Sequence, residues 1–163
     1  MTDEVAEIAI ERLPADFDRW PELLALILRS FAYMNDIIDR PSSALRLTPE
    51  SLALKSANEA CFVATKGQKL AGCVFAAEQP DSLYVGKLTV DPAEQGRGVG
   101  RRLLDAVEDL ARRLKKPVLE LETRVELAGN HAKFQRMGLV ETARNAHSGF
   151  VSPTSITFRK HLA

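Results

Sequence analysis

A glycine-rich loop between a predicted strand and a predicted helix constrains the fold more than any other feature of the sequence. The strand is Leu83–Val90, and the loop reads Gln95-Gly96-Arg97-Gly98-Val99-Gly100. The helix begins at about Val99, because apolar residues then recur at helical spacing as far as Leu114. Glycines let a backbone turn sharply and approach a ligand closely, and the first turn of a helix offers unpaired N–H groups. The sequence therefore predicts an anion site, and a phosphate is the anion that such loops favour.

Two common phosphate-binding loops do not match these residues. A P-loop requires Lys-Ser or Lys-Thr after its last glycine, and neither pair follows Gly100. A dinucleotide-binding loop requires a third glycine, which would replace Arg101 or Leu103 in the two alignments that the glycines allow. Both nucleotide-binding assignments are therefore excluded.

The loop resembles the acyl-coenzyme A loop of the GCN5-related N-acetyltransferases, Gln/Arg-x-x-Gly-x-Gly/Ala, which is here Gln95-x-x-Gly98-x-Gly100. A second segment similar to the family, Asn130–Leu139, follows in the expected order. The resemblance covers about residues 58–161. It implies acetyl-coenzyme A as cosubstrate and acetyl transfer to a primary amine by direct attack on the thioester.

Periodicity and turn signals predict the remaining elements and a single domain over residues 1–163. In chain order these are a strand over 5–12, a helix over Phe17–Phe31, a short helix from the N-cap Thr48 to about Ser56, a hairpin of Cys61–Lys66 and Lys69–Ala77, a strand over Val118–Thr123, a helix over Leu127–Met137, and strands over Leu139–Ala146 and Thr154–Lys160. We expect an α/β fold with a mixed, mostly antiparallel sheet flanked by helices on both sides.

Cysteine content and the N-terminus predict a soluble cytoplasmic protein without a membrane partner. The two cysteines, Cys61 and Cys73, cannot form a disulfide framework, and no metal-ligand spacing is present. If Gly67-Gln68 is a two-residue turn, Cys61 pairs with Val74 and the two thiols lie on opposite faces of the hairpin. The acidic N-terminus differs from a signal peptide, and no run of eighteen apolar residues occurs.

Charge is unevenly distributed along a chain whose net charge is zero. Residues 1–82 carry 8 basic and 13 acidic side chains, a balance of −5, and residues 83–163 carry 14 and 9, a balance of +5. A basic second half suits a ligand with several phosphates, such as coenzyme A. Nucleic acid explains the pattern less well, because much of the excess lies at one helix C-terminus, where the helix dipole favours cations.

The resemblance assigns the cosubstrate residues. The strand before the loop would splay from the strand after the helix, and the backbones of Leu88 and Val90 would pair with pantetheine. The pyrophosphate would lie on Gln95, Gly96, Arg97, Gly98, Val99, Gly100 and Arg101, with Asn130 and Phe134 against the pantetheine or the adenine. An early helical position would also explain Asn130.

Two residues are candidates for the catalytic base, and no metal is expected in the reaction. Glu120 and Glu122 share one face of a strand, and Glu122 is the first choice if that face lies at the splay. Tyr84 is the other candidate, because it occupies the position of a basic glutamate in some family members. A solvent-exposed face would equally explain the two glutamates. A backbone N–H near Val90 would polarise the carbonyl.

Phe134 departs from the family pattern, in which a tyrosine at this position acts as general acid. Tyr33 or water could protonate the thiolate instead, or the step needs no acid. The departure keeps open a second function, a catalytically silent acyl-coenzyme A-binding sensor or partner domain. Tyr33, Asn35, Asp36 and Asp39 could face the cleft, and the two acids would suit a cationic amine as acceptor, either a small molecule or a protein, although a solvated loop would carry similar residues. A homodimer also remains open.

Overall fold

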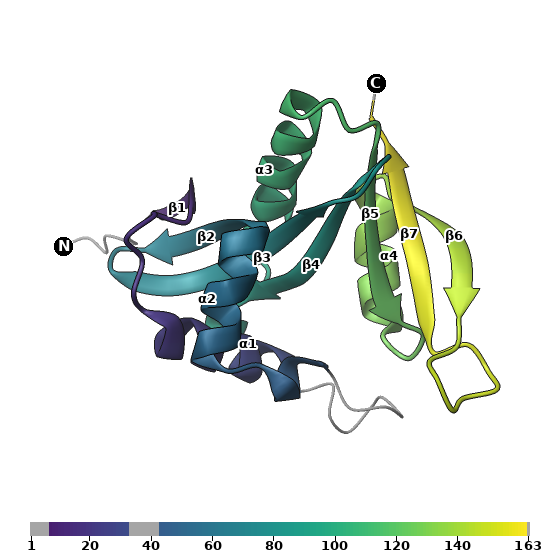
Figure 1. The fold of residues 1–163 in the computed structure, drawn as a ribbon, viewed down its shortest axis with the longest axis horizontal. Helices are drawn as coiled ribbons and strands as arrows, with labels where there is room; N and C mark the ends of the chain where they lie inside the picture. Colours follow the sequence, from purple (N-terminus) through teal and green to yellow (C-terminus); the bar gives the residue numbers. More distant parts are fainter. Residues whose placement is uncertain (1–6, 33–42, 163) are drawn as a thin grey trace.

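A computed structural model describes residues 7–32 and 43–162, which form one seven-stranded sheet with helices on both faces (Figure 1). The strand order is β1-β2-β3-β4-β5-β7-β6. The elements in chain order are β1 (Ile8–Arg12), α1 (Trp20–Phe31), η2 (Ser43–Arg46), α2 (Pro49–Asn58), β2 (Ala60–Lys66), β3 (Lys69–Glu78), β4 (Leu83–Val90), η3 (Pro92–Glu94), α3 (Val99–Arg113), β5 (Val118–Arg124), α4 (Ala128–Arg136), β6 (Val140–Asn145) and β7 (Ser155–His161).

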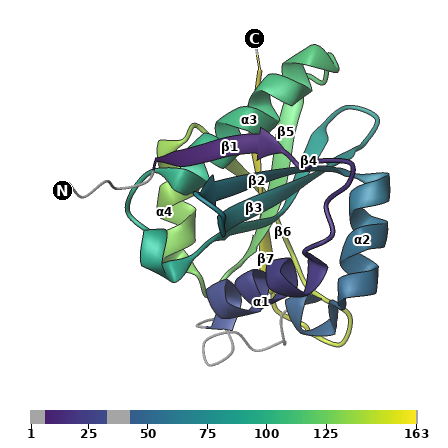
Figure 2. The same ribbon diagram turned by 90° about the vertical axis from the view of Figure 1, so that its left-hand side faces the viewer.

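The helices divide into two pairs that cover opposite faces of the sheet (Figure 2). α3 buries an apolar stripe that includes Leu103 and Val107, and α4 adds Phe134 to the same core cluster. α1 buries Leu23 and Ile27 in a second cluster on the other face, together with Leu52 of α2. The expectation of a mixed, mostly antiparallel sheet between two layers of helices is confirmed, since β4 and β5 are the only neighbouring strands in the described part of the chain that pair in parallel.

Two predicted helix signals, Thr48 and Gly138, lie at helix ends in the structure, whereas α1 begins at Trp20, three residues later than predicted. Thr48 caps α2, because its hydroxyl accepts the Ser51 N–H at 3.0 Å while the Ser51 hydroxyl accepts the Thr48 N–H at 2.8 Å. Gly138 has a φ of +93° just beyond α4, a conformation typical of a helix terminator. No described helix has the length and apolar character required to cross a bilayer.

The predicted register of the β2–β3 hairpin is wrong. The two-residue turn forms as expected, with Lys66 opposite Lys69, but the register shifts between Ala64 and Thr65. Cys61 therefore lies opposite Phe75, and Cys73 lies opposite Val63. Because strand side chains alternate with period two, this shift brings both thiols to one face, in the cluster packed by α1 and α2. A bulge of this kind leaves no mark in the hydrophobic pattern.

A second irregularity lies in β4, next to its point of divergence from β5. Within the described residues the parallel β4–β5 ladder consists of three pairs, from Leu83 with Leu119 to Val85 with Leu121. The β3–β4 register then shifts, and Lys87 adopts a φ of +50°. Beyond this bulge the two strands separate (Figure 1). The edge of β4 that faces β5 is therefore open to a ligand over its second half.

Candidate active site

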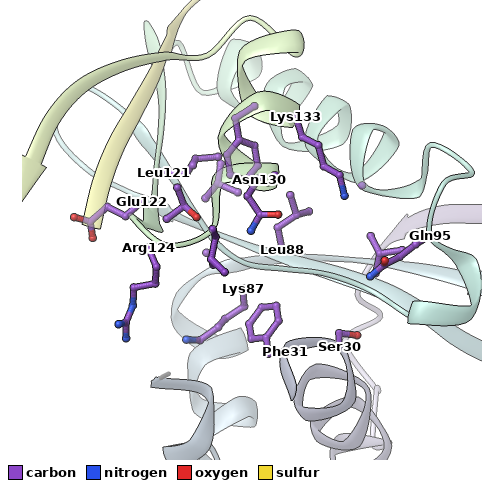
Figure 3. A pocket seen from close by; sticks show the side chains of 18 of the residues that line it. Ser30, Phe31, Lys87, Leu88, Gln95, Leu121, Glu122, Arg124, Asn130 and Lys133 are labelled. Atoms are coloured by element: carbon purple, nitrogen blue, oxygen red, sulfur yellow. The ribbon is translucent and has the colours of Figure 1, made fainter. Parts of the chain in front are cut away.

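The separation of β4 and β5 opens into a cleft of about 870 Å³. Its walls are formed by the second half of β4, the glycine loop, the start of α3, the end of β5 and α4. Phe31 and Ser30 at the end of α1 close the cleft on the other side of β4 (Figure 3). The cleft therefore joins the predicted anion site to the predicted site of chemistry.

The glycine loop presents the N-terminus of α3 to this cleft. Gly98 is the N-cap of α3 and has a φ of +77°, which favours glycine over other residues. A Cβ atom at Gly98 would meet no atom within 4 Å, so the space beside the loop is open. The loop and the first helical turn together form a cradle with free N–H groups and the positive end of the α3 dipole. These residues fit the pyrophosphate of a coenzyme A ester.

Two buried carboxylates hold the strand end and the loop in place. Asp91 accepts the Ala93 N–H at 3.0 Å and is also bound by the Arg29 guanidinium at 3.0 Å. Burial alone would raise the pKa of Asp91, but these two partners lower it below its ordinary value. This anchor was not predicted from the sequence.

Glu94, the second carboxylate, is 3% exposed and lies 3.4 Å from the Lys66 ammonium. The guanidinium of Arg97 lies 3.6 Å from the other Glu94 oxygen. Arg97 is exposed and does not line the cleft, unlike the other residues expected to bind the cosubstrate. The structure therefore places Arg97 in an ion pair that braces the loop.

The remaining predicted cosubstrate residues all line the cleft: Leu88, Val90, Gln95, Gly96, Gly98, Val99, Gly100, Arg101, Asn130 and Phe134. Asn130 lies in the first turn of α4 and points into the cleft (Figure 3). Phe134 packs against Phe158 with 5.9 Å between ring centroids, so its ring forms part of an apolar wall. A phenyl ring in this wall has no proton to give.

The two candidate bases meet at the opposite end of the cleft. The Tyr84 hydroxyl donates to Glu122 Oε1 at 3.4 Å, and both residues line the cleft. Burial, followed by the nearby Glu122 carboxylate, raises the pKa of Tyr84 well above its ordinary value. Tyr84 is therefore a protonated donor at neutral pH, which orients the Glu122 carboxylate as an acceptor.

Glu120 differs from Glu122 although the two share one strand face. Its carboxylate is bound by the Arg159 guanidinium at 2.7 Å, and it does not line the cleft. The structure thus separates two glutamates that share one strand face, and Glu122, the first choice for the base, is the one that lines the cleft. Glu122 alone faces the end of the β4–β5 ladder.

A basic cluster at this end of the cleft was not predicted from the sequence. Arg46, Lys55, Lys87 and Arg124 come from four different elements and all line the cleft. Lys87 in the otherwise apolar strand Leu83–Val90 is the sequence signal that could have indicated this cluster. The residues proposed there, Tyr33, Asn35, Asp36 and Asp39, lie outside the described residues. Within the described ranges, no group of three or more His, Cys, Asp or Glu side chains is arranged to hold a metal ion.

The fold is similar to those of solved acetyltransferases. The PaiA N-acetyltransferase of Thermoplasma acidophilum, solved with coenzyme A, shares 12% identity, with 96% of this chain and 99% of that chain covered at a TM-score of 0.79. The ribosomal-protein-S18-alanine N-acetyltransferase of Escherichia coli shares 19% identity, with 95% and 94% covered and a TM-score of 0.73. A GNAT family acetyltransferase of Elizabethkingia anophelis with acetyl-coenzyme A bound shares 17%, with 95% and 98% covered and a TM-score of 0.69.

The sequence itself matches a family model. No curated protein matches the chain at a significant level. The model of the acetyltransferase (GNAT) family matches residues 20–139, which include the loop, α3 and the diverging strands. With the acyl-CoA N-acyltransferase fold and a cleft that fits a coenzyme A ester, the chain belongs to the GNAT acetyltransferase family and is an acyltransferase that depends on acetyl-coenzyme A.

Proposed function

We propose that the protein is an N-acetyltransferase in which a primary amine attacks the thioester of acetyl-coenzyme A directly, and that residues 1–163 form its single domain. The observation that carries this proposal is the placement of Glu122 and Tyr84 where β4 and β5 separate, in the same cleft as the glycine loop. A base and an anion cradle at two ends of one open strand edge are what this reaction requires.

Glu122 and a backbone N–H near Val90 act at different steps of the proposed reaction. Glu122 takes a proton from the acceptor ammonium, directly or through a water, so that the neutral amine nitrogen can attack the thioester carbonyl carbon. A backbone N–H near Val90 holds the carbonyl oxygen as negative charge develops on it. The C–N bond forms, the C–S bond breaks, coenzyme A leaves as its thiolate, and the second proton lost by the nitrogen passes to that thiolate or to water.

No dedicated acid is needed for the last step. Phe134 cannot protonate the leaving sulfur, and Tyr33 lies outside the described residues. A thiol has a pKa of about 8.5 in water, so its thiolate is already a fair leaving group near neutral pH. Tyr84 keeps its proton and positions Glu122. Its role is therefore to position the base.

Glu122→Gln tests the base, and Glu120→Gln is the matched control on the same strand face. We expect Glu122→Gln to lower kcat/KM for the best amine by about 10²-fold or more, the usual range for loss of a general base. Glu120→Gln removes an ion pair with Arg159 outside the cleft and should change kcat/KM by only a few-fold. Equal losses in the two variants, measured by thiol release, would refute the assignment of Glu122.

One observation favours a second function, a silent acyl-coenzyme A-binding module. Phe134 replaces the tyrosine expected at its position, and a domain released from catalysis would tolerate that change. Titration of acetyl-coenzyme A by calorimetry, followed by thiol release with a panel of amines, separates the two functions. Binding without turnover for every amine would favour the module, whereas amine-dependent thiol release establishes the enzyme.

A further inference from the structure

The chemistry of the acceptor amine can be inferred from the basic cluster. Within the described residues, the charged side chains that line the cleft are seven lysines and arginines and one glutamate, Glu122. Four of the basic residues form the cluster: Arg46 of η2, Lys55 of α2, Lys87 at the β4 bulge and Arg124 at the end of β5. Elements far apart in the sequence thus bring positive charge to one place.

The cluster lies away from the phosphate end of the cleft. Lys133 of α4 points toward Gln95, beside the glycine loop, whereas Lys87 and Arg124 point to the other side, the side of Glu122 (Figure 3). Arg101 belongs to the first turn of α3, at the loop. The cosubstrate phosphates therefore account for Arg101 and Lys133, whereas the cluster brings positive charge to the Glu122 end of the cleft, where it would attract an anionic group of the acceptor.

The bulge in β4 places Lys87 near enough to the other three basic residues for their charges to affect it. Burial, and then the charges of Lys55, Arg46 and Arg124, lower the pKa of Lys87 to about 8. The Glu59 carboxylate acts in the opposite direction on the pKa of Lys87, and it also pairs with Lys55 at 2.9 Å. Like charges held this close repel one another, and a bound anion offsets that repulsion.

We propose that the acceptor is a small amine that also carries an acidic group, a carboxylate or a phosphate, which is bound by Lys87 and Arg124 with support from Arg46 and Lys55. The amine then lies beside Glu122, in line with the proposed N-acetyltransferase function, on which this inference rests. Glu122 and Arg124 project from the same face of β5 two residues apart, about 7 Å along the strand. One compact molecule can therefore reach both, and charge-assisted hydrogen bonds to its acidic group fix its orientation.

Matched pairs of acceptors test the proposal with wild-type protein. Amino acids are compared with their carboxamides, and phosphoethanolamine with ethanolamine, using kcat/KM expressed per neutral amine because the pKa of the amine differs within each pair. We expect kcat/KM per neutral amine to be about tenfold higher or more for the acidic compound in one of the two pairs. The pair of acceptors that shows this preference identifies the bound anion as a carboxylate or a phosphate. Equal or better turnover of the uncharged partners, or of peptides without a free carboxylate, would overturn the proposal.

Variants then connect the preference to the cluster. Lys87→Met and Arg124→Met keep much of the side-chain length and should lower the ratio of acidic to uncharged substrate by about tenfold each. Arg113→Met, at the exposed C-terminal end of α3, is the control that removes a positive charge outside the cleft and should leave the ratio unchanged. A ratio unaffected by either cluster variant would contradict the assignment.

A binding measurement distinguishes failure of this inference from failure of the proposed function. The acidic compound and its amide are titrated by calorimetry into protein saturated with coenzyme A, with no turnover required. Tighter binding of the acid, increasing as the pH falls through about 8 because Lys87 becomes protonated, supports the anion site even if no amine is acetylated. Equal binding of the two compounds overturns the anion site, whatever the enzyme does.

Discussion

A substitution at Gly72 of β3 tests whether the close approach of β3, β4 and α3 maintains the shape of the cleft. It lies opposite Val90 of β4, directly below the start of α3. A Cβ atom added at Gly72 would lie 2.6 Å from the Thr89 carbonyl oxygen, 3.2 Å from Leu103 Cδ1 and 3.4 Å from Val99 Cγ1. The closest of these atoms belongs to the backbone, so relief requires β4 or α3 to move.

The cost of Gly72→Ala follows from this geometry. Overpacking of a buried site typically costs about 1–3 kcal/mol, and a backbone contact at 2.6 Å places Gly72 at the upper end. Loss of glycine flexibility in the unfolded chain offsets about 0.4–1 kcal/mol. We therefore expect Gly72→Ala to lower the free energy of unfolding by about 2 kcal/mol, and the displaced Val90 backbone to weaken binding of acetyl-coenzyme A as well.

Gly86 of β4 is the matched control, because the same substitution there meets only Tyr84 Cε1 at 3.9 Å. Gly86→Ala should be neutral or stabilising by a few tenths of a kcal/mol. Urea unfolding measures both variants; with a slope of about 2 kcal/mol per molar, Gly72→Ala should lower the midpoint by about 1 M. A Gly72→Ala midpoint equal to that of wild type, or an equal loss in Gly86→Ala, would refute the argument from close approach.

Three further predictions follow from the loop, the helices and the anchor. Gly98→Ala should weaken acetyl-coenzyme A binding about tenfold in calorimetry, because alanine at a φ of +77° costs about 1–2 kcal/mol, and Gly98→Asn should recover part of it; equal affinities would contradict this. Thr48→Ala should cost about 1 kcal/mol in urea unfolding through loss of the capping box, and an unchanged midpoint would count against the cap. Asp91 has a lowered pKa, so its contribution to stability is present above the unfolded value of about 4 and is lost as the pH falls through the folded value. Asp91→Asn should therefore reduce the dependence of the unfolding free energy on pH in the acid range, and an equally steep dependence would refute this.

Local patterns predicted most of the fold because each element carries its own signals. α3 begins at Val99 as expected, since its glycine loop and apolar stripe agree. β4 has the predicted bounds, Leu83–Val90. Thr48 identified the start of α2 through its capping pattern. These features depend on neighbours within a few residues, so a single sequence contains them.

The features that sequence reasoning missed arise from contacts between distant segments. The hairpin bulge that puts Cys61 and Cys73 on one face depends on how β3 meets its neighbours, and the alternating pattern around it fits either register. Glu122 was preferred over Glu120 from the sequence, but the ion pair that holds Glu120 outside the cleft involves Arg159 of the distant strand β7. Burial of Asp91 and Glu94 depends on Arg29 and Lys66, which lie in other elements.

The bulge at Lys87 connects the two halves of the proposed mechanism. Its carbonyl accepts the Thr89 hydroxyl at 2.8 Å, which fixes the irregular turn of the strand, and its φ of +50° carries a strain that a regular strand would not have. The register with β3 shifts at this bulge, and the bulge lies just after the last β4–β5 pair. It also directs the Lys87 ammonium group toward the Glu122 side of the cleft (Figure 3). Straightening β4 would have two effects at once: its free edge would close against β5, and Lys87 would leave the cluster. In the proposed function, access for the acetyl donor and recognition of the acceptor's acidic group are therefore two consequences of one backbone irregularity. A glycine at this position would be less strained than lysine, but it would not supply the positive charge.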